Sequence, residues 1–286
     1  MTYFLEGELS DAERDPATAR FRVIPVPLER TVSYGGGTEG GPAAILEASV
    51  ELERLYRDAE PCAAGIATEE PVDCTGPLPE VMERIAARTE AAVAAGAVPV
   101  TLGGEHALSY GAVRGVARAL GRPVGIVQID AHADLRKAYQ SERHSHASVM
   151  QLLAEEDGIH IAQYGVRAMS QEEVDRRAAC NVISIDAEEL VTGNIQSVTL
   201  PADFPQDVYV SFDVDGLDPA ILPATGTPVP GGLGYYQALN IVRSALAGRN
   251  LAGCDVVELA PTEDSRVSEF TTAQITYALM SFATPK

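Results

Sequence analysis

The chain is predicted to form a three-layer α/β/α domain, in which helices cover both faces of a mostly parallel, doubly wound sheet. Two observations predict this class. Short β-branched runs alternate with helical patterns along all 286 residues. Several of these runs have apolar residues on both faces, as expected for strands buried on both sides. No repeat, low-complexity segment or charged linker divides the chain, so we expect residues 1–286 to form a single domain.

The predicted strands are the short runs rich in Val and Ile. They cover residues 21–26, 98–102, 124–129, 159–163, 182–185, 208–212 and 254–259. Apolar residues at helical spacing lie between them. The predicted helices cover residues 42–56, 79–95, 107–120, 147–155, 171–178, 235–247 and 269–282. Gly and Pro cluster in residues 34–42 and 223–233, which are therefore predicted to be loops.

Composition narrows the possible partners and compartments. With 21 basic and 41 acidic residues the net charge is -20, which argues against nucleic acid or an anionic membrane as a partner. The longest uncharged apolar stretch, residues 91–104, contains Pro99 and is too short to cross a bilayer. The first eleven residues lack the basic region of a secretory signal, so a cytoplasmic protein is expected. The four cysteines form no Cys-x-x-Cys pair and are predicted to be reduced and mostly buried.

Metal-type ligands follow three of the predicted strands. Side chains alternate along an extended segment, so ligands spaced by two residues project from one face. The candidate ligands are Asp130, His132 and Asp134 after the run 124–129, Asp213 and Asp215 after the run 208–212, and His106 after the run 98–102. In open α/β sheets, ligands bind at the carboxyl ends of the strands. An isolated Asp-x-Asp more often marks a turn or a helix cap. Three groups of candidate ligands at one edge of the sheet, however, indicate a metal site.

The ligand types also indicate which metal is bound. Carboxylates and imidazoles without thiolates favour Mn²⁺ over a structural Zn²⁺ site. Six ligands exceed what one ion needs. Two ions roughly 3.5–4 Å apart, bridged by carboxylates, can together activate a water molecule. The sequence therefore predicts two Mn²⁺ ions per chain.

Six motifs together identify a family resemblance. They are Gly103-Gly104-Glu105-His106, Asp130-Ala131-His132-Ala133-Asp134, Ser145-His146-Ala147-Ser148, Ser211-Phe212-Asp213-Val214-Asp215-Gly216-Leu217-Asp218-Pro219, Gly226-Thr227-Pro228 and Val257-Glu258. Through these motifs almost the whole chain resembles the ureohydrolases, which include agmatinases, arginases, guanidinobutyrases and formimidoylglutamases. The resemblance implies an arginase-like fold, a Mn²⁺ pair, hydrolysis of a cationic guanidino compound to urea and an amine, and assembly into trimers or hexamers.

The resemblance also implies residue roles. It places His106 and Asp134 on one ion, His132 and Asp215 on the other, and Asp130 and Asp213 between them. Glu258 matches the residue that orients the guanidinium by paired hydrogen bonds. His146 matches the histidine that carries a proton to the departing amine. The predicted catalytic set is therefore His146, Asp134 and Glu258, with Glu258 and His146 also contacting substrate.

Other candidate residues are interpreted from their surroundings. His144 could reach the cleft but is better explained as a solvated loop residue, and His160 is predicted to be a satisfied core residue. Residues 35–40 satisfy Gly-x-Gly-x-x-Gly, but eight residues separate this motif from the preceding strand and Pro42 begins the helix. We therefore interpret the glycine-rich segment as a rim loop of the active site.

The substrate prediction rests on the stretch before His146. Arginases typically read Ser-Gly-Asn-Leu-His there, whereas residues 141–146 read Ser-Glu-Arg-His-Ser-His. This departure favours an agmatinase, which converts agmatine to putrescine. Arg143 leaves open a carboxylate-bearing substrate such as 4-guanidinobutyrate. The alternatives are a guanidinobutyrase, arginase, formimidoylglutamase or guanidinase, and beyond these a metal-dependent deacetylase or a noncatalytic member.

Overall fold

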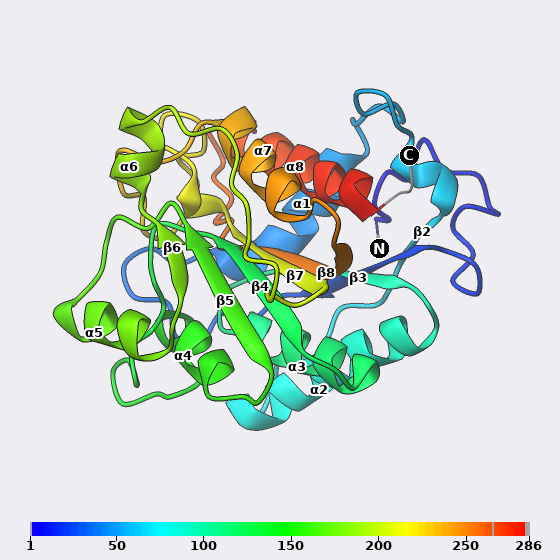
Figure 1. Ribbon diagram of the computed structural model, residues 1–286. Coiled ribbons are helices and arrows are strands. Elements are labelled where there is room, and N and C mark those ends of the chain that lie inside the picture. The colour runs from blue at the N-terminus through cyan, green and yellow to red at the C-terminus, as the bar shows by residue number, and fades with distance from the viewer. Residues whose placement is uncertain (1, 265, 284–286) are drawn as a thin grey trace.

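The computed structural model describes residues 2–264 and 266–283, and its eight strands form one sheet (Figure 1). The strand order is β2-β1-β3-β8-β7-β4-β5-β6, and every neighbouring pair is parallel. The strands are β1 Phe21–Val26, β2 Ile66–Thr68, β3 Val98–Gly103, β4 Val124–Ile129, β5 Ile159–Tyr164, β6 Ile183–Ile185, β7 Asp207–Asp213 and β8 Asn250–Val257. Because β7 and β8 insert between β3 and β4, these four strands end side by side.

Helices cover both faces of the sheet, which confirms the three-layer prediction. In Figure 1, α2, α3 and α4 lie below the sheet, and α1, α7 and α8 lie above it. The helices are α1 Gly41–Ser49, α2 Leu78–Ala94, α3 Leu108–Leu120, α4 Val149–Ala154, α5 Gln171–Ala179, α6 Ala187–Thr192, α7 Tyr235–Ala245 and α8 Val267–Ala283. None of the helices in the described part of the chain is long and apolar enough to cross a membrane.

The two layers of helices explain why the central strands have apolar residues on both faces. In β4, Val124 and Ile126 pack into the core formed with α2, α3 and α4. Val127 and Ile129 pack into the core on the opposite face, together with side chains of α1, α7 and α8. Successive side chains of a strand point to opposite faces, so both sets are removed from water.

The structure corrects several element boundaries. The helix expected over residues 42–56 ends at Ser49, and β8 covers residues 250–257 where 254–259 was expected. The strand cannot continue because Glu258 has a left-handed backbone with φ 66°. The short elements β2 and α6 were not predicted.

One prediction about individual side chains was wrong, and another was confirmed in part. His160 was predicted to lie in the core, and this prediction was wrong, since it is exposed at the second position of β5. The four cysteines are free, as predicted. Cys62 and Cys254 are buried, whereas Cys74 and Cys180 are half-buried.

Candidate metal centre and active site

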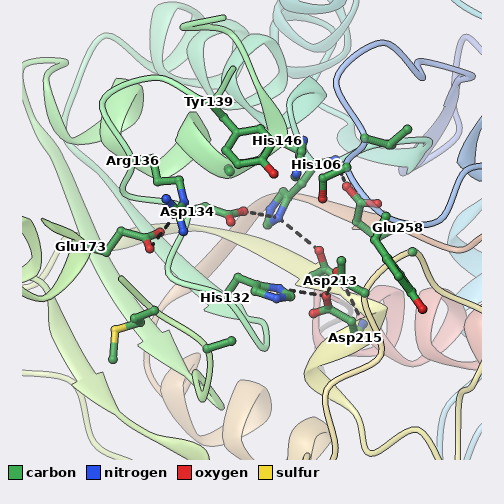
Figure 2. A pocket seen from close by; sticks show the side chains of 18 of the residues that line it. His106, His132, Asp134, Arg136, Tyr139, His146, Glu173, Asp213, Asp215 and Glu258 are labelled. Atoms are coloured by element: carbon green, nitrogen blue, oxygen red, sulfur yellow. Dashed lines mark hydrogen bonds and ion pairs between the residues drawn. The ribbon is translucent and has the colours of Figure 1, made fainter. Parts of the chain in front are cut away.

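The ends of β3, β7 and β4 lie at the same edge of the sheet and bring the predicted metal ligands together. His106 follows β3, Asp213 ends β7, and Asp130 follows β4. Figure 2 shows the labelled ligands from these strand ends pointing toward one another inside a single cavity. The crevice at the carboxyl ends of the strands is where open α/β sheets bind their ligands.

His106 lies at the centre of a first ligand group with Asp130 and Asp134. Its Nδ1 atom is 3.1 Å from Asp130 Oδ2, 2.9 Å from Asp134 Oδ2 and 3.3 Å from Asp213 Oδ2. The side chain is 1% exposed, yet Nδ1 has no hydrogen-bond partner of acceptable geometry among the described residues. One imidazole nitrogen facing three carboxylate oxygens, all removed from water, is the donor set of a buried cation.

A second ligand group contains His132, Asp215 and, again, Asp130. His132 Nδ1 lies 3.0 Å from Asp215 Oδ2 and 3.6 Å from Asp130 Oδ1. Asp130 therefore offers one carboxylate oxygen to each group. A shared carboxylate is the arrangement that holds two ions close together.

The electrostatics of the cluster favour the binding of positive charge. Burial, together with the neighbouring Asp130 carboxylate, raises the pKa of Asp134 to about 7. Burial and the carboxylates of Asp215 and Asp130 likewise raise the pKa of Asp213 well above its ordinary value. Burial opposes the charged form of His132, but hydrogen bonds to Asp130 and Asp215 raise its pKa to about 12. The negative charges of these buried carboxylates repel one another unless a positive charge lies nearby. Divalent ions would supply that positive charge in place of protons.

Hydrogen bonds around the ligands fix their orientation. Gln128 Nε2 donates to Asp130 Oδ2 at 2.7 Å, and the Ala131 backbone N–H donates to Asp215 Oδ1 at 3.0 Å. His106 Nε2 lies 2.8 Å from Ser211 Oγ, which donates to Asp255 Oδ1 at 2.8 Å. Such contacts hold the ring of a ligating histidine in place and set its tautomer.

Two of the site residues have left-handed backbones, which are uncommon outside glycine. Asp134 has φ 53° and Glu258 has φ 66°. The Asp134 carbonyl accepts hydrogen bonds from Met150 and Gln151 at the start of α4, at 3.1 and 3.2 Å. The Glu258 N–H donates to the Gly104 carbonyl at 2.9 Å. The surrounding structure thus maintains a strained backbone at both residues, as is common at functional sites.

Glu258 and His146 face the same cavity as the ligands. Glu258 Oε1 accepts a 2.6 Å hydrogen bond from the His106 backbone N–H. Burial and the nearby Glu105 carboxylate raise the pKa of Glu258 to about 8. This carboxylate therefore lies next to the metal ligands without being a member of either ligand group.

The position of His146 is set by Thr31 and Tyr139. His146 Nδ1 lies 3.0 Å from Thr31 Oγ1, which also accepts from the His146 backbone N–H at 3.0 Å. The ring packs edge-on against Tyr139 with the ring centroids 5.4 Å apart. Burial and the positive charges of His106 and His132 lower the pKa of His146 to about 4.

The cavity has a volume of about 420 Å³. Tyr34 and Gly35 lie in its wall, so the glycine-rich segment forms part of the rim, as predicted. The wall also contains Arg136, Tyr139 and Glu173, which the sequence analysis did not single out. Arg136 lies two residues after Asp134, but the left-handed backbone of Asp134 ends the alternation there, so spacing alone does not indicate Arg136.

Two residues considered from the sequence lie elsewhere. Arg143 forms an ion pair with Glu155, its side chain is 60% exposed, and it is not among the residues that line the cavity. His144 lies near Glu142 and Tyr110 and does not line the cavity either. The structure therefore brings together the six candidate ligands, His146 and Glu258, but not Arg143.

Comparison with known proteins assigns the chain to a family. The sequence model of the Arginase family matches residues 19–281. The chain belongs to the arginase family. This ureohydrolase is 38% identical to N(1)-aminopropylagmatine ureohydrolase of Synechocystis sp. over 98% of its own length and 93% of the relative. It is 30% identical to the agmatinase of Pyrococcus horikoshii over 94% of both chains.

A solved structure confirms the arginase-like fold. The arginase of Medicago truncatula superposes on this arginase-family chain with a TM-score of 0.84 at 26% identity, covering 92% of this chain and 87% of the other. The predicted fold class and the predicted family are both confirmed. The chain is accordingly a hydrolase of guanidino compounds.

Proposed function

We propose that this ureohydrolase holds two Mn²⁺ ions and hydrolyses a guanidino amine, either agmatine or its N¹-aminopropyl derivative, to urea and the corresponding amine. The observation that carries the proposal is the pair of ligand groups that share Asp130, in one cavity with Glu258 and His146. The two relatives above are named for these two substrates. Neither ligand group contains a thiolate, which supports Mn²⁺ over structural Zn²⁺.

The substrate poses a specific chemical problem. A guanidinium carbon is a poor electrophile because its positive charge is delocalised and its pKa exceeds about 12. When bound, the two ions would make a water molecule nucleophilic at neutral pH. The six residues that would hold them are His106, Asp130, His132, Asp134, Asp213 and Asp215.

The remaining residues orient the substrate and move protons. Glu258 would accept paired N–H hydrogen bonds from the guanidinium and so hold its carbon beside the ligands, a role supported by its position in the cavity wall. His146 takes a proton released during attack and passes it to the departing amine nitrogen as the C–N bond breaks. Thr31 keeps the His146 ring in position for this transfer.

A urea-release assay tests the proposal. Protein treated with a chelator is reloaded with Mn²⁺ and assayed with agmatine, N¹-aminopropylagmatine, arginine, 4-guanidinobutyrate and guanidine. We expect the metal-free protein to be inactive and the reloaded protein to hydrolyse the two guanidino amines fastest. Protein that holds two ions per chain and releases urea from none of these compounds would contradict the proposal.

We further infer a cytoplasmic homo-oligomer. The free state of all four cysteines is consistent with a reducing compartment. A trimer or hexamer follows from resemblance to the ureohydrolases. Light scattering of the purified protein tests the assembly, and a monomeric mass would contradict it.

A further inference from the structure

The cavity wall contains a pair of charged side chains that the proposed chemistry does not use. Besides the metal ligands, His146 and Glu258, the charged residues lining the cavity are Glu173 and Arg136. Figure 2 shows both on the opposite side of the metal ligands from Glu258. A substrate whose guanidinium faces Glu258 and the ligands would leave its other end free to approach this wall.

Glu173 is a buried carboxylate with hydrogen-bonding capacity to spare. It is 3% exposed. Its Oε2 atom accepts from the Ser170 N–H at 2.8 Å and from the Ser170 hydroxyl at 2.9 Å, which completes the capping box at the start of α5. Its Oε1 atom accepts one long bond, from the Leu135 N–H at 3.3 Å. A carboxylate has about four acceptor positions, so Oε1 can accept another donor from the cavity.

The positive partner of Glu173 is held loosely. Arg136 Nε lies 3.7 Å from Glu173 Oε2, which is longer than a hydrogen bond, and the arginine side chain is 37% exposed. The guanidinium carbon of Arg136 also lies 5.7 Å from the centre of the Tyr139 ring. Among the described residues, no other ion pair of Glu173 is found. The carboxylate is thus fixed in the wall, whereas the arginine can move toward solvent.

We propose that Glu173 binds the protonated amine in the tail of the substrate, and that Arg136 moves aside when it does. The amine N–H groups donate to the Glu173 carboxylate, so the site selects guanidines with a cationic tail. This inference rests on the proposed function and deepens it. Since Glu173 is buried and fixed while Arg136 is partly exposed, the charge that is held in place at this end of the cavity is the negative one.

A role in helix capping alone would also explain Glu173, and the two roles make different predictions. Capping uses Oε2 and would affect every substrate equally. Amine binding would affect only substrates with a charged tail. A comparison of agmatine with n-butylguanidine, which has the same guanidinium but a methyl group in place of the amine, separates them.

The test uses Glu173→Gln, which keeps an acceptor oxygen for Ser170 and removes the charge. We expect kcat/KM for agmatine to fall about ten- to hundredfold, while kcat/KM for n-butylguanidine stays within about twofold. Glu172→Gln is the matched control, because Glu172 is an exposed carboxylate on the same turn of α5, and it should leave both values unchanged. Glu173→Asp retains the charge and should retain the preference for agmatine.

Arg136→Gln and a binding measurement complete the test. Arg136→Gln should keep kcat/KM for agmatine within about threefold and lower it for 4-guanidinobutyrate, whose carboxylate loses the cation in the wall. Titration calorimetry with 1,4-diaminobutane should show weaker binding to Glu173→Gln than to the wild-type protein. An equal loss for both guanidines in Glu173→Gln, or unchanged diamine binding, would overturn the inference. If the wild-type protein hydrolysed no guanidine, the proposed function would fail, and the diamine titration would still decide the role of Glu173.

Discussion

Asp130 is the residue on which the two ligand groups depend, because it contributes to both. Asp130→Asn keeps the shape of the side chain and removes the charge that would bridge two ions. We expect this variant to lose bound metal and urea release together. Elemental analysis and the urea assay measure the two losses, with Asp203→Asn as a control at an exposed position. A variant that kept two ions and turned over normally would show that Asp130 does not bridge.

His146 should be needed for turnover but not for metal binding, because it belongs to neither ligand group. His146→Ala should lower kcat by about 10²–10⁴-fold, the usual contribution of a general acid or base. Its metal content should match that of the wild-type protein. His144→Ala is the control, since His144 does not line the cavity, and it should be nearly as active as the wild type. A severe defect in His144→Ala with normal turnover in His146→Ala would transfer the role to His144.

The residues that could be predicted from the sequence are those with a local pattern. Five of the six candidate ligands alternate along the chain at the ends of two strands, and their clustering follows from the parallel sheet. Glu258 was identified only by resemblance, because a glutamate after a strand has no distinctive spacing. Thr31 and Glu173 were not predicted, since each reaches the site from a segment far away in the sequence. Thr31, for example, precedes its partner His146 by 115 residues.

At the level of the elements, close backbone contact at the end of β3 explains one glycine of the metal motif. A Cβ on Gly104 would lie 2.0 Å from the Leu28 carbonyl oxygen and 2.8 Å from its carbon. These are backbone atoms, so they cannot move aside as a flexible side chain can. Gly104→Ala should therefore lower the free energy of unfolding by about 3 kcal/mol and displace His106.

Urea denaturation of the metal-free protein measures this loss, and metal content after reloading measures the displacement of His106. Gly7→Ala is a suitable control, because its added Cβ would meet only the Val50 carbonyl oxygen, at 3.9 Å. The control should change stability by less than about 0.5 kcal/mol. Equal stabilities for the two variants would show that the contact with Leu28 relaxes easily.

The segment before β1 is joined to the residues after α1 by an ion pair, which makes a prediction about pH. Arg54 Nη2 lies 2.7 Å from Glu13 Oε1, and this bond, together with hydrogen bonds from the Ser10 N–H and hydroxyl, lowers the pKa of Glu13 from 4.5 to about 2. Because the folded-state pKa is the lower one, the pair stabilises the fold fully above about pH 4.5 and progressively less as the pH falls toward 2.

Glu13→Gln should therefore lower Tm above pH 5 and have a smaller effect at pH 3.5. Thermal unfolding across this range checks the prediction, with Glu8→Gln as a control at an exposed position. A difference in Tm that does not change with pH would show that Glu13 acts through packing and not through its charge.

The elements found from the sequence are those long enough to show a pattern. The runs at β1 and β4 were predicted to the residue, because each is a six-residue run rich in Val and Ile with a single long polar side chain. The strand β2 has three residues and the helix α6 has six, which is too short for either periodicity to appear. At β8 the strand begins four residues earlier than expected, because pairing with β7 extends it over Asn250 to Gly253.

At the level of the whole molecule, the strand order creates the site. His106 and Glu258 are 152 residues apart in the sequence, yet a hydrogen bond joins them because β8 lies beside β3. The alternation of strands and helices predicts a parallel sheet but not which strands are neighbours. The strand order was therefore not predicted, and the structure shows its physical consequence, which is that the ends of β3, β8, β7 and β4 surround one cavity.

The charge of the whole molecule and of its cavity leads to the last prediction, that agmatine is a better substrate than arginine. Both present the same guanidinium, but only arginine brings a carboxylate, which would enter a cavity whose fixed wall charge is Glu173. Glu173 would repel that carboxylate and compete with it for Arg136, which we expect to cost about 3 kcal/mol, so kcat/KM for agmatine should exceed that for arginine at least about a hundredfold. The net charge of -20 should also attract the doubly charged agmatine more strongly than n-butylguanidine. Added salt should therefore lower kcat/KM more for agmatine than for n-butylguanidine, because salt screens this attraction. Urea assays at low and high salt test both effects. If arginine were hydrolysed as fast as agmatine, the guanidino-amine assignment would be ruled out. If 4-guanidinobutyrate were the best substrate, Arg136 would be identified as the residue that binds the tail.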